Sequence, residues 1–271
     1  MNYQIYYPCE ELKHFIQCYW SLEATEQENI GKQVIVPDGH IEFVFHYGSL
    51  YKKFEGSMVA QFQPRCFLLG QLTRPLEIFP SGDTGIFAVR FFPGAAEPLL
   101  SLPVRSIENN EIDLEKIYGE KGKEISLKIT TSKENPERIR LIESFLLMLL
   151  ENKREIDMEL KYAIDAITKV NGNISVNDVS DKVKVQRRQL ERKFSKGVGF
   201  GPKKFIKMIR LQYALRLLLN NRFSNLADLT YKCGYFDQAH FIKDFKEFTG
   251  IPPTEFFNNK ASVYFKFYGM K

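Results

Sequence analysis

Hydrophobic and polar positions change their spacing once along the chain, near residue 130. Before that point, short runs rich in β-branched and aromatic residues are bounded by turn-forming sequences such as Pro-Asp-Gly and Pro-Gly. The clearest of these runs predict strands over 33–36, 41–47 and 85–92. Short helices are expected over 95–100 and 112–118. The pattern therefore predicts a β-rich N-terminal domain, either a small sandwich or a barrel.

Beyond residue 130 the apolar positions recur every three or four residues, which is typical of helices. The stretch 136–150 begins with a proline suited to a first helical turn and carries a wide apolar stripe. Its members are Ile139, Ile142, Phe145, Leu146, Leu149 and Leu150. Two interpretations stay open: a connecting helix packed on its own domain, or a dimerisation helix. From Asp157 onward the pattern is helical throughout.

A chain of 271 residues exceeds the size that one hydrophobic core usually serves, so two domains are expected. We predict an α+β protein with a β-rich N-terminal domain, resembling a barrel or sandwich, and an all-α C-terminal domain. The expected divisions are a β-rich domain at 1–130, a linker helix at 131–156, a helical domain at 157–258 and a tail at 259–271.

Basic charge is concentrated in the second part of the chain. Residues 152–271 contain 23 Lys and Arg against 12 Asp and Glu, whereas residues 1–151 contain 15 against 21. A surplus of this kind indicates a polyanionic partner for the C-terminal part, without distinguishing DNA from RNA or an anionic membrane.

The N-terminus lacks the basic and apolar segments of a secretory signal, and the most apolar run, 145–150, is too short to span a bilayer. The cysteines are far apart in the sequence, with no Cys-x-x-Cys spacing: Cys9, Cys18, Cys66 and Cys233. We therefore expect a soluble, cytoplasmic protein that holds its thiols reduced, with neither a disulfide framework nor a zinc site.

Residues 175–194 have the pattern of a helix-turn-helix unit. Valines at 176, 179 and 183 give the first helix its buried side, Lys184 and Val185 occupy the turn, and Leu190 with Phe194 face inward from the second helix. The outward positions of that second helix are Arg187, Arg188, Glu191 and Arg192. Arginine can bond both acceptors of a guanine edge, so this face can read bases as well as bind phosphates.

Residues 226–248 repeat the pattern. Gly234 supplies a turn, Asp237 is placed to cap the second helix, and phenylalanines at 241, 245 and 248 share one inner face. The groove-facing candidates are Gln238, Ala239, His240 and Lys243. A helix over 202–220, about 28 Å long, would hold the two units apart. Two recognition helices can enter successive major-groove turns when they lie roughly 34 Å apart on one face of the duplex.

The stretches FSKGVGFGPKKFIKMIRLQYALRLLLN and LADLTYKCGYFDQAHFIKDFKEFTGIPPTEF resemble the DNA-binding domain of the AraC/XylS family of bacterial transcription regulators. The signature positions are Gly199, Pro202, Arg210, Leu211, Ala214, Leu217, Leu218, Gly234, Tyr235, Phe241, Phe245, Lys246, Gly250 and Pro253. The resemblance covers 157–256, and it implies base contacts at Arg188, Glu191 and Arg192, and at Ala239, His240 and Lys243. It implies promoter DNA as the partner, with RNA polymerase, a small-molecule effector and a second copy of the chain as further candidates.

Two positions depart from the family pattern. Thr230 stands where alanine is usual, and Ala239 stands where a polar reader is common, so the second helix should read fewer bases directly. In the first half, YWSLE, PDGHIEFVF, GQLTRP and AVRFFPGAA resemble the cupin-like domain of some relatives. That resemblance implies an effector pocket, for which the candidate lining is Phe43, Phe45, Phe87, Val89 and Phe91, residues that would equally make an ordinary core.

His40, Glu42 and His46 would share a strand face, and side chains of these types can bind zinc or iron. They lack the paired histidines and spacing of metal-binding cupins, so we predict no metal and no other cofactor. A cupin-type enzyme or a DNA-repair protein, and a non-specific nucleic-acid packer, remain as alternatives. The sequence favours a sequence-specific DNA-binding regulator without enzymatic activity.

Overall fold

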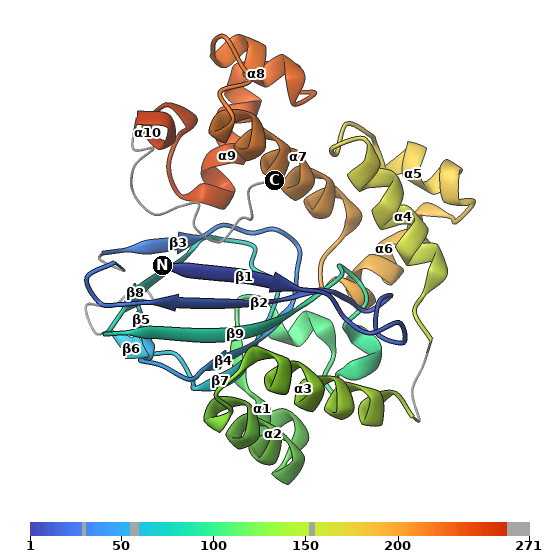
Figure 1. The fold of residues 1–271 in the computed structure, drawn as a ribbon. Helices are drawn as coiled ribbons and strands as arrows, with labels where there is room; N and C mark the ends of the chain where they lie inside the picture. The colour runs from blue at the N-terminus through green and yellow to red at the C-terminus, as the bar shows by residue number, and fades with distance from the viewer. Residues whose placement is uncertain (29–30, 55–59, 152–154, 259–271) are drawn as a thin grey trace.

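The computed structural model describes residues 1–28, 31–54, 60–151 and 155–258. The chain has a β-rich N-terminal part and a helical C-terminal part, as predicted (Figure 1). The predicted tail, 259–271, lies outside the described residues. The strands are β1 (Asn2–Tyr6), β2 (Ile16–Ala24), β3 (Gln33–Ile35), β4 (Glu42–His46), β5 (Tyr51–Lys53), β6 (Gln61–Phe62), β7 (Cys66–Leu69), β8 (Leu76–Pro80), β9 (Thr84–Phe91) and β10 (Glu111–Asp113).

These strands form two antiparallel sheets, one in the order β1-β2-β9-β4-β7-β10 and the other in the order β3-β8-β5-β6. The larger sheet is covered on both faces, so all five residues of β4 are buried. Because side chains alternate along a strand, Phe43 and Phe45 face one core while Val44 faces the other. Successive residues of β4 are thus buried in two different cores, one on each face of the sheet.

Helices cover the outer face of the larger sheet (Figure 1). They are the 3₁₀ turns η1 (Glu97–Leu99) and η2 (Val104–Ile107), and the helices α1 (Leu114–Tyr118), α2 (Glu120–Thr131) and α3 (Asn135–Leu150). Ile142, Phe145 and Leu146 of α3 are buried in the same core as Phe43. The apolar stripe of α3, for which a role in dimerisation was an open interpretation, thus packs largely on its own domain.

The C-terminal part consists of short helices around one long helix, α7. They are α4 (Met158–Lys169), α5 (Val176–Val183), α6 (Arg187–Gly197), α7 (Pro202–Leu219), α8 (Leu226–Lys232), α9 (Gln238–Thr249) and α10 (Pro253–Asn258). One continuous apolar cluster runs from Leu160 of α4 to Phe256 of α10. At the usual rise, the 18 residues of α7 extend about 27 Å. The helix-turn-helix units therefore share a core through α7.

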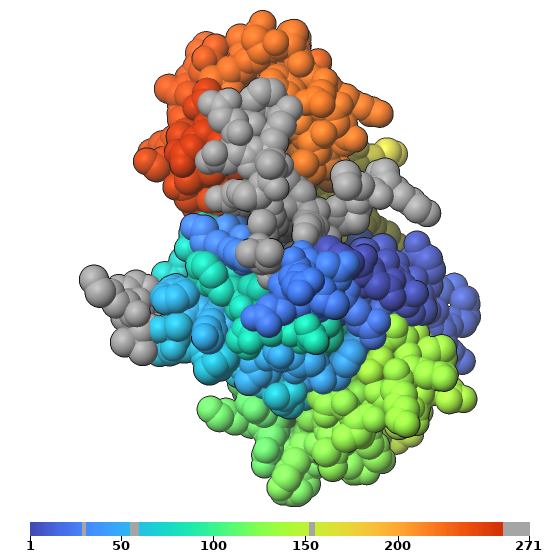
Figure 2. Space-filling model, turned by 60° about the vertical axis from the view of Figure 1, so that its left-hand side comes forward, coloured from blue at the N-terminus to red at the C-terminus, as the bar shows by residue number. Residues whose placement is uncertain are grey.

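The two parts of the chain are in direct contact. The orange and red residues of the C-terminal part lie at one end of the N-terminal domain (Figure 2). Val34 and Val36 belong to the apolar cluster of the C-terminal helices. The Nε2 atom of Gln212, on α7, donates a hydrogen bond to the carbonyl oxygen of Pro37 at 2.7 Å. None of the described helices is long and apolar enough to cross a membrane.

Candidate nucleic-acid interface

The first helix-turn-helix unit is shaped by capping at its beginning and by a left-handed residue at its turn. Ser175 Oγ accepts a hydrogen bond from the Asp178 backbone nitrogen at 3.1 Å, and Asp178 Oδ2 accepts one from the Ser175 backbone nitrogen at 3.2 Å. Lys184 ends α5 with φ of +55°, and Val185 is buried beneath the turn. The predicted turn residues are thus confirmed, and they direct the chain into α6.

The inner face of α6 is formed by Leu190 and Phe194, which are fully buried. Its outer face carries three exposed arginines, at 187, 188 and 192. Glu191 is half-buried, and a Cβ atom on Gly201 would lie only 2.7 Å from its Oε2. This places the Glu191 carboxylate beside the N-terminus of α7, where the helix dipole favours a negative charge. Of the four side chains predicted to face the groove from α6, the three arginines are therefore more exposed than Glu191.

The second unit repeats this design with different residues. Gly234 adopts φ of +70°, a conformation that glycine takes without strain. Asp237 caps α9, since its Oδ1 accepts a hydrogen bond from the backbone nitrogen of His240 at 2.7 Å. The three predicted phenylalanines of α9 are buried. The predicted groove-facing side chains are all exposed: Gln238, Ala239, His240 and Lys243.

Polar contacts attach α7 to both units. Lys207 Nζ lies 2.7 Å from Asp244 Oδ1, on α9, and Tyr235 donates a hydrogen bond to the other oxygen of that carboxylate at 3.4 Å. Partial burial would lower the pKa of Lys207, but the hydrogen bond to Asp244 raises it above its ordinary value. Toward the first unit, Arg210 Nε donates to the carbonyl oxygen of Gly172 at 2.7 Å, and Arg216 donates to Asn171 Oδ1 at 2.8 Å.

The turn of the second unit also touches the loop that leads into the first unit. A Cβ atom on Gly234, in the second turn, would lie 2.5 Å from Oδ1 of Asn173, in the loop that follows α4. This approach is too close for any side chain larger than hydrogen. The loop between α4 and α5 therefore lies directly against the turn before α9.

Three exposed side chains near the recognition helices were not predicted. Gln189 is exposed on α6, Tyr231 at the end of α8 is 83% exposed, and Phe236 is 99% exposed. Phe236 directly precedes the helix cap, a position from which apolar residues commonly pack back onto the helix. Sequence position alone could not show that this ring is turned outward.

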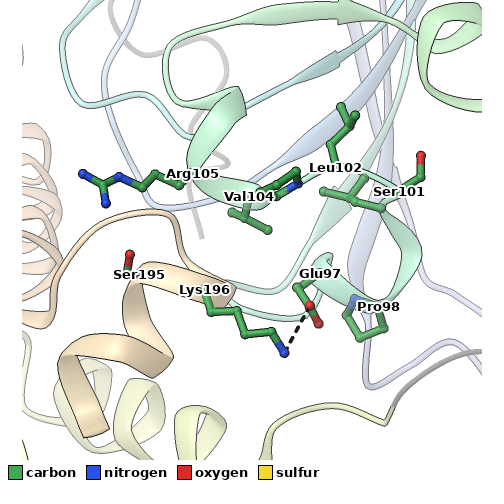
Figure 3. Close-up of a pocket in the computed structure, with 10 residues that line it drawn as sticks. Glu97, Pro98, Ser101, Leu102, Val104, Arg105, Ser195 and Lys196 are labelled. Carbon is green, nitrogen blue, oxygen red and sulfur yellow. Dashed lines mark ion pairs between the residues drawn. The ribbon is translucent and has the colours of Figure 1, made fainter. Parts of the chain in front are cut away.

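A groove adjoins the end of α6 where it meets the N-terminal domain. Figure 3 shows Lys196 reaching Glu97 of η1 across this groove, with a separation of 3.3 Å between Nζ and Oε1. A second ion pair joins Lys204 Nζ to Glu108 Oε1, also at 3.3 Å. Both pairs are partly exposed, so each contributes little to stability by itself. Lys196, near the end of α6, and Lys204, on α7, thus both lie beside the N-terminal domain, while the arginines of α6 stay exposed.

The residues predicted to line an effector pocket are packed in a closed core. Phe43, Phe45, Phe87, Val89 and Phe91 are all fully buried and belong to the cluster under α1, α2 and α3. On the opposite face of the same sheet is a small cavity, which we call the inter-sheet cavity. Its lining is Trp20, Ile35, Asp38, Glu42, Val44, His46, Gln63, Phe67, Leu69, Ile78, Ile86 and Arg90.

The inter-sheet cavity combines an apolar wall with an ionised cluster. Arg90 donates to Glu42 Oε1 at 2.5 Å and forms an ion pair with Asp38. Burial would raise the pKa of Asp38, but Arg90 and His40 beside it hold that pKa well below its usual range. His46 is 1% exposed, and burial lowers its pKa to about 4, so its ring is neutral at pH 7.

The three residues of the candidate metal site do not converge on a common point. His40 Nδ1 lies 3.0 Å from Arg90 Nη2, Glu42 is bound to Arg90, and His46 stacks against Tyr51 with 5.6 Å between ring centroids. Among the residues that the structure describes, no three His, Cys, Asp or Glu side chains are grouped to hold a metal ion.

Two family models match the chain. Residues 179–259 match a helix-turn-helix domain, and residues 4–113 match a domain of unknown function (DUF6597). The lactose operon transcription activator of Staphylococcus xylosus is 30% identical over 102 residues, which is 37% of this chain and 36% of that protein. The HTH-type transcriptional regulator GbdR of Pseudomonas aeruginosa is 34% identical over 82 residues, 30% of this chain and 22% of that protein. The chain thus spans about a third or less of these relatives' lengths.

Solved structures of other proteins also align with this chain. ToxT from Vibrio cholerae aligns over 95% of this chain and 97% of its own, with a TM-score of 0.47 and 11% identity. A transcriptional regulator from Chromobacterium violaceum, described as having an AraC-type DNA-binding domain, aligns over 39% of this chain and 94% of its own. Its TM-score is 0.36 and its identity 27%.

Proposed function

We propose that this chain is a sequence-specific transcription regulator of the AraC type that binds promoter DNA, since residues 179–259 match a helix-turn-helix domain and the relatives that share this region are regulators. One observation carries the proposal: both recognition helices, α6 and α9, bury their inner faces in one shared core and leave their outer faces exposed. The relatives with which it shares this region are named as regulators rather than as enzymes.

In this mechanism the basic face of the C-terminal part neutralises phosphates and supplies most of the affinity, while a few outward side chains select the sequence. Arg188 and Arg192 suit guanine edges because each can donate two hydrogen bonds in one plane. The contacts of α7 with both units support simultaneous reading of two half-sites about one helical turn apart.

Selection of bound duplexes from a random library tests this function. A specific regulator should enrich two half-sites about one helical turn apart and retain a preference of about a thousandfold over random DNA. An unselective basic protein would enrich no sequence, and that outcome would refute the proposal. The same proposal includes contact with RNA polymerase and pairing of two copies of the chain. Analytical ultracentrifugation with and without the selected duplex tests the pairing, because it measures the mass of the complex.

We further propose that the inter-sheet cavity receives a small effector, apolar over most of its surface and with a polar group near Arg90. The apolar wall formed by residues such as Phe67 and Ile78 would bury the body of the molecule. The ionised cluster at Arg90 offers a few directed polar partners, the usual arrangement in ligand sites.

A short segment, residues 34–39, links this cavity to the DNA-binding part. Ile35 and Asp38 line the cavity, while Val36 is buried among the C-terminal helices. A Cβ atom on Gly39 would lie 3.0 Å from the ring of Phe205, on α7. An occupant that displaces Ile35 or Asp38 would therefore move the residues that contact α7.

A thermal-shift screen of small metabolites tests the effector proposal, with Val44→Phe as the blocking variant. Val44 is 6% exposed and lines the cavity, so the larger ring should fill it. A hit should raise the melting temperature of the wild-type protein and change its affinity for the selected duplex. The same hit should do neither in Val44→Phe, provided that the variant still binds the duplex; an equal response in both proteins would refute the cavity as the site.

A further inference from the structure

Phe236 is the most exposed large apolar side chain of the described residues, with 99% of its surface accessible. It lies one residue before Asp237, the cap of α9. In many helices an apolar residue at this position packs on the fourth residue after the cap, here Phe241. Phe241 is instead 1% exposed and packs against Tyr235 and Phe245, with ring centroids 5.3 and 5.7 Å away.

Among the described residues the Phe236 ring is thus almost unburied, which leaves it accessible to a partner. N-terminal residues of a recognition helix contact base edges in the major groove. The side chains around Phe236 at this end of α9 are Gln238, Ala239 and His240, and all three are exposed. Ala239 is itself apolar and small, so the first turn of α9 offers an apolar patch next to polar readers.

The major-groove edge of DNA presents one apolar group, the C5-methyl of thymine. We infer that Phe236 is a specificity-determining residue that contacts a thymine methyl in the half-site read by α9. This inference rests on the proposed function, since it needs α9 in the major groove. Lys243, exposed one turn further along α9, is placed to bind a phosphate beside that base.

The test replaces each thymine of the selected α9 half-site, one at a time, by deoxyuridine, which lacks only the methyl group. With the full-length wild-type chain, one replacement should weaken binding about fourfold, the effect of one buried methyl group. Phe236→Ala should bind the thymine duplex about fourfold more weakly than the wild type and should bind both duplexes equally. Because Phe236 is so exposed, the variant should keep the wild-type melting temperature.

Tyr231→Ala is the matched control, because Tyr231 is also an exposed aromatic residue but lies at the end of α8. It should retain the fourfold thymine preference whether or not its overall affinity falls. The inference is overturned if no methyl in that half-site matters, or if the preference survives in Phe236→Ala; a protein-binding role for Phe236 would give this result. Failure to enrich any half-site would instead refute the proposed function together with the inference.

Discussion

Nζ of Lys207 lies 2.7 Å from Oδ1 of Asp244, a carboxylate whose side chain is only 2% exposed. The first residue belongs to α7 and the second to α9, so this ion pair joins the spacer helix to the second recognition helix. A buried carboxylate is costly unless it is paired and hydrogen-bonded. The orientation of α9 is therefore coupled to the position of Lys207.

Lys207→Met should leave Asp244 buried without its cationic partner. We expect the free energy of unfolding to fall by about 1–3 kcal/mol, measured by urea denaturation. DNA affinity should fall mainly through the α9 half-site, because the pair joins α7 to α9. Lys203→Met, which removes an exposed lysine of α7, is the control for stability and should leave the free energy of unfolding unchanged. Equal stability of Lys207→Met and the wild type would contradict the role given to the pair.

Arg188→Ala and Arg192→Ala should each weaken binding to the selected duplex by about 1–3 kcal/mol and relax the sequence preference at one position. Fluorescence anisotropy with the selected and a shuffled duplex measures both effects. Lys123→Ala removes an exposed cation of α2, in the N-terminal domain, and should leave the preference intact. If both arginine variants retain the wild-type preference, α6 is not the reading helix of the first unit.

The C-terminal half was predictable because its signals are local. Asp237 caps α9 through a residue three positions away, and Gly234 forms its turn within the same unit. Helix spacing also identified the buried faces, since the phenylalanines of α9 can share only one side. What the sequence could not show is the contact between Gly234 and Asn173, because it joins positions about 60 residues apart.

The N-terminal half depends on pairing between distant strands, and prediction was less complete there. The sequence analysis did not predict strands β1 and β2. These strands pair antiparallel, with Asn2 opposite Glu23 and Tyr6 opposite Tyr19. Helix α2 was missed as well, in a stretch that contains Gly122, whose backbone packs against the carbonyl oxygen of Leu114. Alternation along β4 separated Phe43 from Val44, but it could not show which of the two faces adjoins a cavity.

The buried imidazole of His46 should make the protein less stable as the pH falls below about 6.5. Burial lowers the folded-state pKa of His46 to about 4, Arg65 adds to this effect, and Gln63 opposes it in part. Between pH 6.5 and 4 the unfolded chain therefore binds a proton that the folded chain does not. The loss of stability reaches about 2 kcal/mol at pH 5.

His46→Phe should remove this dependence, because phenylalanine does not titrate and suits the aromatic surroundings of Tyr51 and Phe67. Urea denaturation at pH 7 and pH 5 gives the measurement, and the difference between the two pH values should be about 2 kcal/mol smaller in the variant. An unchanged difference would mean that His46 is already protonated in the folded protein or that other groups determine the slope.

Gln71 should be replaceable by methionine with a gain in stability. The side chain is 0% exposed, and neither amide atom has a hydrogen-bond partner among the described residues. It lies where the two parts of the chain meet, since a Cβ atom on Gly199 would be 3.2 Å from its Oε1. Methionine has a similar shape and no such polar groups, so we expect Gln71→Met to stabilise the chain by about 1–3 kcal/mol.

Thermal unfolding measures this gain, and Gln63→Met provides the matched control. Gln63 is also buried, but its Nε2 donates a hydrogen bond to Glu111 Oε1 at 2.6 Å. Gln63→Met should therefore lower the melting temperature, whereas Gln71→Met should raise it. Because Gln71 lies in the contact between the two parts, the gain should be accompanied by slower amide exchange around Gly199. A lower melting temperature for Gln71→Met would show instead that the amide is bound in the folded protein.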